Sequence, residues 1–185
     1  YRALILGENP RDYVAAPFSP GYHDTTLTVQ GFVATGTQAN QASSVALSTA
    51  WRMEPELEVQ FVEFAPFASA NNDQIAYGVI NDTHNLGQYA LGVTAGSYAF
   101  RQDGTVLHDN TVSVTGLPTW AGSDVMALGW VNSTRTLSLW RNGTRIYSMA
   151  LPTGTWTPAV TLGANVGTTI TALLASLAVL RPEGL

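Results

Sequence analysis

The sequence has no cysteine and no lysine, and it has few charged residues of any kind. Without cysteine the chain cannot form disulfides, thiolate metal sites or iron–sulfur clusters, and it cannot use thiol catalysis. Without lysine it cannot contain a phosphate-binding loop of the G-x-x-x-x-G-K type. Charged residues make up 11% of the chain, where about 25% is usual. We therefore expect an unusually neutral surface.

The sequence also lacks an excess of positive charge and a long apolar run. The formal net charge is −5, which argues against a nucleic-acid partner because phosphate binding needs a basic surface. The longest apolar run, 170–180, contains Thr171 and Ser176 and is shorter than the ~20 residues of a membrane helix. We expect neither nucleic acid nor a membrane among the partners, whereas self-association into a homo-oligomer stays open.

Short alternating runs separated by Gly, Asn, Asp and Pro fill most of the 185 residues. A period of two between turn residues is typical of β-strands. Residues 1–23 are predicted to form an extended lead-in with one helical turn at Tyr1–Leu6, and residues 24–185 a single domain. The predicted strands are Thr26–Val33, Ser44–Leu47, Glu56–Phe64, Gln74–Ile80, Gly87–Val93, Ser97–Gln102, Thr105–His108, Asp124–Val131, Thr136–Arg141, Thr144–Ala150, Ala159–Leu162 and Thr168–Leu180.

The clearest local signal is the dipeptide Asn142-Gly143 between two alternating runs. Both residues tolerate the positive φ that a type I′ turn requires, so the pattern predicts a two-residue hairpin. Counting outward from the turn pairs Trp140 with Arg145 and Ser138 with Tyr147. The three side chains Trp140, Arg145 and Tyr147 then share one face of the hairpin. We predict that this face contacts a ligand or partner, since these residue types are enriched in binding hot spots. Cover of the face by the lead-in at 1–20 and a simply exposed pair of side chains are the alternatives.

The same alternation assigns an apolar side to several other strands. Strands with one apolar face each pack as two sheets. The sequence therefore predicts an all-β, two-sheet antiparallel sandwich. The side chains expected to point inward are Leu57, Val59, Phe61, Tyr89, Leu91, Val93, Tyr98, Phe100, Met126, Leu128 and Trp130.

The carboxylate cluster at 56–63 contains Glu58, Gln60 and Glu63 in an E-x-Q-x-x-E spacing. This spacing resembles the E-x-D-x-x-E strand of jelly-roll glycoside hydrolases that cut β-glucans. Retaining hydrolysis needs two carboxyl groups about 5 to 5.5 Å apart. Glu58 and Glu63 would lie on opposite faces of a regular strand, and Gln60 removes the negative neighbour. We therefore predict a solvated strand face and no enzymatic activity, with a divergent hydrolase as the alternative.

No other residues suggest a cofactor or a metal. His23, His84 and His108 lie far apart in sequence, without metal-ligand spacing. The loops at 71–73 and 81–83 offer hard oxygen ligands for calcium, but turn formation explains them better. The sequons at Asn81, Asn132 and Asn142 are read as loop residues. We predict no cofactor and no metal.

The order of these segments resembles the concanavalin A-like, laminin-G-like jelly roll over roughly residues 24–182. The resemblance rests on Trp51-Arg52-Met53 before the Leu57–Phe61 strand, on the Leu139–Gly143 hairpin and on the closing 174–180 segment. The hairpin, with 156–160 after it, is also similar to SPRY domains, which share the two-sheet architecture.

The opening segment Tyr1–Leu6 resembles the start of laminin-G-type modules in tail proteins of bacteriophages, particularly those of actinobacteria, hosts that would also suit the absence of lysine. This resemblance implies a non-enzymatic accessory or adhesion module of a virion. Its partners would be a neighbouring virion subunit or a host-envelope glycan. A secreted bacterial carbohydrate-binding module is the remaining alternative.

Overall fold

The computed structural model describes residues 13–14, 18–23, 27–30, 33–36, 44–48, 59–64, 75–85, 89–162, 169–171 and 177–178. These residues form strands and connections, with no helix among them, and so no helix of the described chain could span a membrane. The strands are β1 (Tyr13–Val14), β2 (Phe18–His23), β3 (Leu27–Gln30), β4 (Val33–Gly36), β5 (Ser44–Ser48), β6 (Val59–Phe64), β7 (Ala76–Ile80), β8 (Ser97–Arg101), β9 (Val106–His108), β10 (Thr111–Val114), β11 (Met126–Val131), β12 (Thr136–Arg141), β13 (Thr144–Ala150), β14 (Thr157–Leu162), β15 (Thr169–Thr171) and β16 (Leu177–Ala178).

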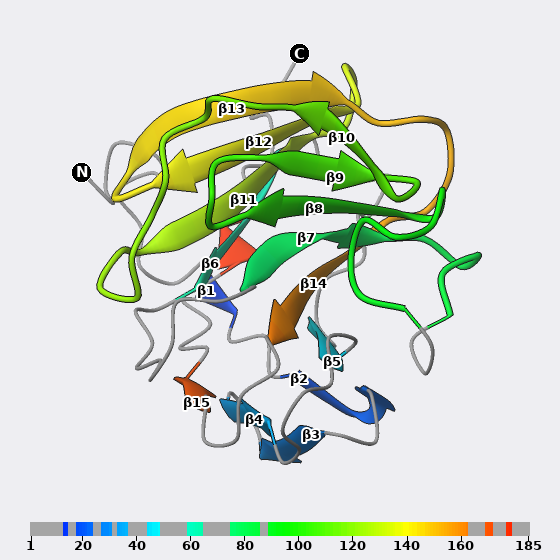
Figure 1. The fold of residues 1–185 in the computed structure, drawn as a ribbon, viewed down its shortest axis with the longest axis vertical. Coiled ribbons are helices and arrows are strands. Elements are labelled where there is room, and N and C mark those ends of the chain that lie inside the picture. The colour runs from blue at the N-terminus through cyan, green and yellow to red at the C-terminus, as the bar shows by residue number, and fades with distance from the viewer. Residues whose placement is uncertain are drawn as a thin grey trace.

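Two antiparallel sheets face each other (Figure 1). One has seven strands in the order β10-β9-β8-β7-β14-β5-β2, and the other has four in the order β13-β12-β11-β6. Two small sheets, β1-β16 and β15-β4-β3, complete the described strands. The predicted two-sheet antiparallel sandwich is therefore confirmed.

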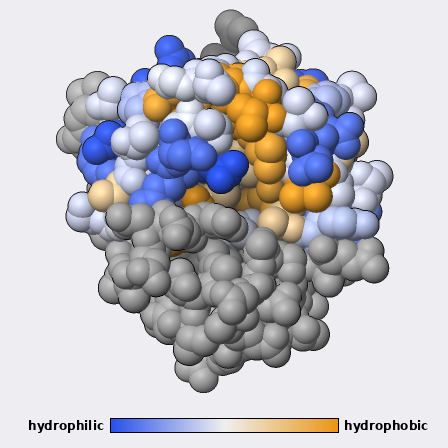
Figure 2. Space-filling model, viewed as in Figure 1, coloured by the Kyte–Doolittle hydropathy of each residue, from blue (hydrophilic) through white to orange (hydrophobic). Residues whose placement is uncertain are grey.

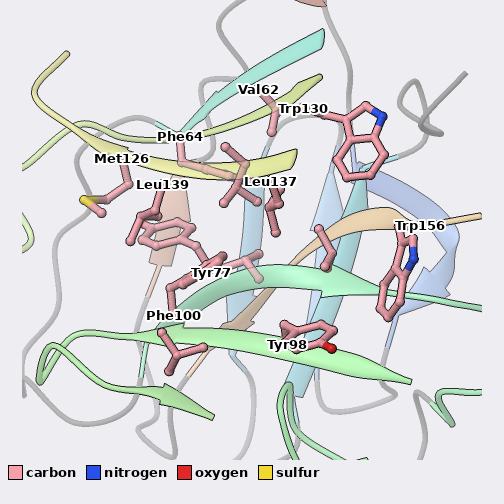
Figure 3. Packing of buried hydrophobic residues seen from close by; sticks show 14 of the residues in the cluster. Val62, Phe64, Tyr77, Tyr98, Phe100, Met126, Trp130, Leu137, Leu139 and Trp156 are labelled. Atoms are coloured by element: carbon pink, nitrogen blue, oxygen red, sulfur yellow. The ribbon is translucent and has the colours of Figure 1, made fainter. Parts of the chain in front are cut away.

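The core lies between the two larger sheets. Trp130, Leu137 and Leu139 extend from the four-stranded sheet toward Tyr77 and Phe100 of the seven-stranded sheet (Figure 3). All five side chains are at most 1% exposed. Full burial of side chains of this size contributes about 1.5–3 kcal/mol each, so this layer is the main source of stability.

The inward residues of β8 and β11 are confirmed, because Tyr98, Phe100, Met126, Leu128 and Trp130 all belong to the core cluster. The prediction for β6 was wrong. Val62 and Phe64 face the core, whereas Phe61 lies on the opposite face, edge-on to the ring of Trp140 at 5.6 Å. Because β6 carries apolar residues on both faces, its alternation does not show which face is inside.

Several predicted strand boundaries differ from the structure. Residues 89–93 form a loop instead of a strand, and Leu91 from this loop packs on Ala99 and Ala159, on the outer face of the seven-stranded sheet. The predicted strand Thr26–Val33 is divided between β3 and β4, which pair as a hairpin. The lead-in contributes β1 and β2, and β2 pairs with β5. The expected helical turn at Tyr1–Leu6 and most of 172–180 lie outside the described residues.

Candidate interaction surface

The predicted hairpin forms at Asn142-Gly143, where φ is 48° and 77° as a type I′ turn requires. The predicted pairing of Trp140 with Arg145 is also present. Beyond it the register shifts, because a bulge leaves Ile146 without a partner and sets Tyr147 opposite Leu139. A bulge of one residue moves every following side chain to the other face.

The bulge separates the three predicted contact residues, so the prediction that they share one face was wrong. Tyr147 turns toward the core and lies edge-on to Phe100, with 5.9 Å between ring centroids. Trp140 stays on the outer face, half-buried beside Phe61, and Arg145 is exposed. Whether any of the three contacts a ligand or a partner stays a prediction.

The side of the sandwich bounded by β10 and β13 is the most distinctive part of the described surface. Both strands end their sheets, so each has a partner on one side only among the described strands. Half-buried side chains on and near these strands continue the core to the surface. We call this side the open edge, and its apolar side chains are Val112, Val114, Leu117, Ile146, Tyr147 and Met149.

Apolar atoms reach the surface at one boundary of the open edge. Val112 is 46% exposed and pairs with the half-buried Leu107 on the outer face of the sheet. Figure 2 shows apolar side chains gathered over β8, β9 and β10 between hydrophilic areas. β10 contains no charged residue and β13 contains one, Arg145. Natural proteins commonly block exposed strand edges with charges, and this edge has little of that protection.

Sequence reasoning missed β10 and with it half of the open edge. Asp109 and Asn110 form the β9–β10 turn with φ of 48° and 55°. An Asp-Asn pair between two β-branched runs is a hairpin signal of the same kind as Asn-Gly. The signal was present in the sequence, although Asn-Gly is the stronger form because glycine has no strain at positive φ.

Asp124 fixes the β12–β13 turn to the rest of the molecule. Its carboxylate accepts hydrogen bonds from the Ala121 N–H at 2.8 Å and from the Asn142 side chain at 2.6 Å. Arg141 Nε lies 3.0 Å from Oδ2, the oxygen that also accepts from Ala121, whereas Asn142 donates to Oδ1. Burial alone would raise the pKa of Asp124, but these hydrogen bonds and the charge of Arg141 together lower it. Asn142 is therefore a structural turn residue, as its sequence context predicts.

His84 belongs to the loop over the seven-stranded sheet and is buried. Its Nδ1 lies 2.9 Å from Thr94 Oγ1, and its Nε2 lies 3.1 Å from the carbonyl oxygen of Tyr89. Burial lowers the pKa of this imidazole, against a smaller opposite effect of the Tyr89 carbonyl. Both ring nitrogens have partners in the loop, which explains His84 without a ligand. His108 instead stacks on Tyr98, with 3.9 Å between ring centroids.

The described carboxylates include Glu63, one of the two carboxylates of the hydrolase alternative. No group of three His, Asp or Glu in the described part of the chain could hold a metal ion. Gln60 is fully buried on the core side, whereas Glu63 lies on the other face of β6 opposite Ala127. Glu58, the second carboxylate of the hydrolase alternative, lies outside the described residues.

In comparisons with known proteins, no family model and no curated protein matches this chain. The solved SPRY domain of human HERC1 is 15% identical, with a TM-score of 0.68 over 90% of this chain and 99% of that chain. A human SPRY domain is 17% identical, with a TM-score of 0.60 over 83% of this chain and 95% of that chain. The TRIM65 PSpry domain is 13% identical, with a TM-score of 0.65 over 88% and 93%.

These similarities show the fold. The chain has the jelly-roll sandwich architecture of SPRY domains, as the resemblance of its hairpin and of 156–160 implied. Because one fold carries many functions, the role of the chain must be argued from its own surface.

Proposed function

We propose that this chain is a non-enzymatic binding module of a phage virion, placed in the tail, and that it holds a neighbouring virion subunit at the open edge. The observation that carries the proposal is the continuation of the core to the surface between β10 and β13. The cores of protein interfaces are depleted in charge and contain large apolar side chains. The open edge has this composition.

The placement in a virion rests on sequence. The opening Tyr1–Leu6 resembles phage tail modules, and the absence of lysine suits an actinobacterial host. The architecture shared with solved SPRY domains agrees with a binding role. Lectins and hydrolases share the same sandwich architecture, so the choice between a binding and a catalytic role has to be argued from the surface of this chain.

A protein partner fits the described surface better than a host-envelope glycan. Sugar binding favours an exposed aromatic platform with amides nearby, but Trp140 is half-buried beside Phe61. Tyr89 is the large aromatic side chain that is exposed among the described residues, at 41%. The open edge instead offers mainly aliphatic side chains, which pack well against another protein.

The proposal is tested by cross-linking within the particle. A photoreactive amino acid is placed at Val112 on the open edge, and at the exposed Asp82 as the matched control. We expect irradiation of purified virions to attach the Val112 probe, but not the Asp82 probe, to a virion protein. Absence of the chain from virions, or equal cross-linking from both positions, would contradict the proposal. Release of reducing ends from cell-wall polysaccharide would instead support the hydrolase.

A further inference from the structure

The two ends of the open edge carry opposite charges that have no ion-pair partner among the described residues. Arg101 pairs with Asp103, Arg141 pairs with Asp124, and Arg135 donates to backbone carbonyls of the 151–154 loop. Arg145 is the remaining arginine of the described residues. Its side chain is exposed and has no ion pair among those residues. Asp109 is an exposed carboxylate in the β9–β10 turn and has no ion pair among the described residues either.

These two charges lie at opposite ends of the open edge and on different sheets. Arg145 stands at the start of β13, beside the β12–β13 turn, and Asp109 follows the end of β9. Figure 1 shows β9 and β13 running in the same direction. The end of β9 therefore lies at the far end from the start of β13. The apolar side chains of β10 and β13 lie between the two charges.

A surface with this pattern is complementary to itself. Consider a two-fold axis through the middle of the open edge, perpendicular to the line from Asp109 to Arg145. It places Asp109 of each copy against Arg145 of the other copy. In an isologous interface both contacts form at once, since residue i meets residue j and j meets i. The apolar middle of one copy then meets that of the other, and no charge is left buried without a partner.

We propose that two copies of this chain associate through their open edges, with Asp109 of each copy paired to Arg145 of the other. A net charge of −5 makes two copies repel each other, so association needs local attraction of this kind. The inference rests on the proposed function, because it names a partner for the same surface. It is separable from that function, since a monomer could still contact a different virion protein.

The test reverses each charge separately and then both together. Asp109→Arg and Arg145→Asp each bring two like-charged pairs together, and we expect each to weaken self-association by roughly tenfold or more. The double variant restores opposite charges and should dimerise like the unmodified chain. An equimolar mixture of the two single variants should form a heterodimer, because both of its contacts are then attractive. Sedimentation velocity over a concentration series measures each case.

The control is Asp82→Arg, which changes the charge equally at an exposed position in the loop after β7. It should leave self-association no weaker than in the unmodified chain. A chain that stays monomeric at every concentration would overturn the inference, and so would a dimer that tolerates either single reversal. If the monomer still cross-links from Val112 to another virion protein, the proposed function survives without the dimer. If a dimer forms but the chain is absent from virions, the dimer survives without the proposed function.

Discussion

Asp124 shows at the scale of one residue how a polar group can be buried at little net cost. The side chain is 9% exposed, and an ionised carboxylate so deeply buried is strongly unfavourable unless it is paired. Ala121, Arg141 and Asn142 satisfy both of its oxygens. The same contacts hold the turn that begins β13, so Asp124 also positions one boundary of the open edge.

The substitution Asp124→Asn removes the charge that these contacts stabilise. It should lower the free energy of unfolding by roughly 1–3 kcal/mol at neutral pH. The folded-state pKa of Asp124 is lowered, so its stabilisation is present above the unfolded value of about 3.9 and is lost as the pH falls through the folded value. Urea unfolding between about pH 7 and pH 2.5 should show a smaller loss of stability on acidification in the variant.

The control for this prediction is Asp103→Asn. Asp103 forms an exposed pair with Arg101, at 3.3 Å, with the side chain of Asp103 50% exposed. Such surface pairs contribute less than about 1 kcal/mol, and asparagine can still accept the hydrogen bond from the Thr105 N–H. Equal losses in the two variants would mean that the contacts of Asp124 add nothing beyond an ordinary surface pair.

At the scale of the strand, close approach of two backbones explains one glycine. A Cβ built on Gly78 would lie 1.9 Å from the carbonyl oxygen of Tyr98, on the neighbouring strand β8. A backbone atom cannot turn aside as a flexible side chain can. β7 and β8 would have to separate, and they are central strands of the seven-stranded sheet.

We expect Gly78→Ala to lower the free energy of unfolding by about 3 kcal/mol or more, the upper range for inserting a methyl group into a packed region. Gly116→Ala is the matched control, because its Cβ would meet no atom within 4 Å. Its φ of 80° should cost only about 1–2 kcal/mol. Thermal unfolding of both variants measures the difference. A Gly78 variant as stable as the Gly116 variant would show that the sheet absorbs the added atom.

The strands that could be predicted from sequence are those whose signal is local. Asn142-Gly143 sets its own φ angles, so the turn and the first two pairs of the hairpin follow from the residues alone. The bulge at Ile146 does not, because it depends on Tyr147 packing against Phe100 of the other sheet. That one tertiary contact decides which face carries Tyr147, and it therefore separated the predicted contact residues.

The inner face of β6 and the loop at 89–93 could not be predicted for a related reason. Both faces of β6 are covered, so its alternating apolar residues do not show which face points into the core. In the loop, Leu91 is buried on the outer face of the seven-stranded sheet, in a cluster with Ala76, Ile80, Ala99 and Ala159. An apolar residue in a covering loop has the same sequence pattern as one in a strand.

At the scale of the whole molecule, a strand from the first part of the chain pairs with a strand from the last part. β1 pairs with β16 through Tyr13 and Ala178, and β16 contacts β6 of the four-stranded sheet. β2 pairs with β5 in the seven-stranded sheet. β1 and β2 therefore join both sides of the sandwich, although the sequence of 1–23 predicts only an extended lead-in.

Deleting residues 1–23 tests whether this segment belongs to the cooperative unit. The deletion removes β1 and β2 and exposes the edge of β5, so we expect the free energy of unfolding to fall by ~3 kcal/mol or more from lost backbone pairing alone. The slope of stability against urea should also decrease, because less surface is exposed when the shorter chain unfolds. A chain lacking only residues 1–12 keeps both strands and serves as the control. If the two shortened chains unfold at the same urea concentration with the same slope, the first 23 residues are a separate lead-in and the domain begins after them.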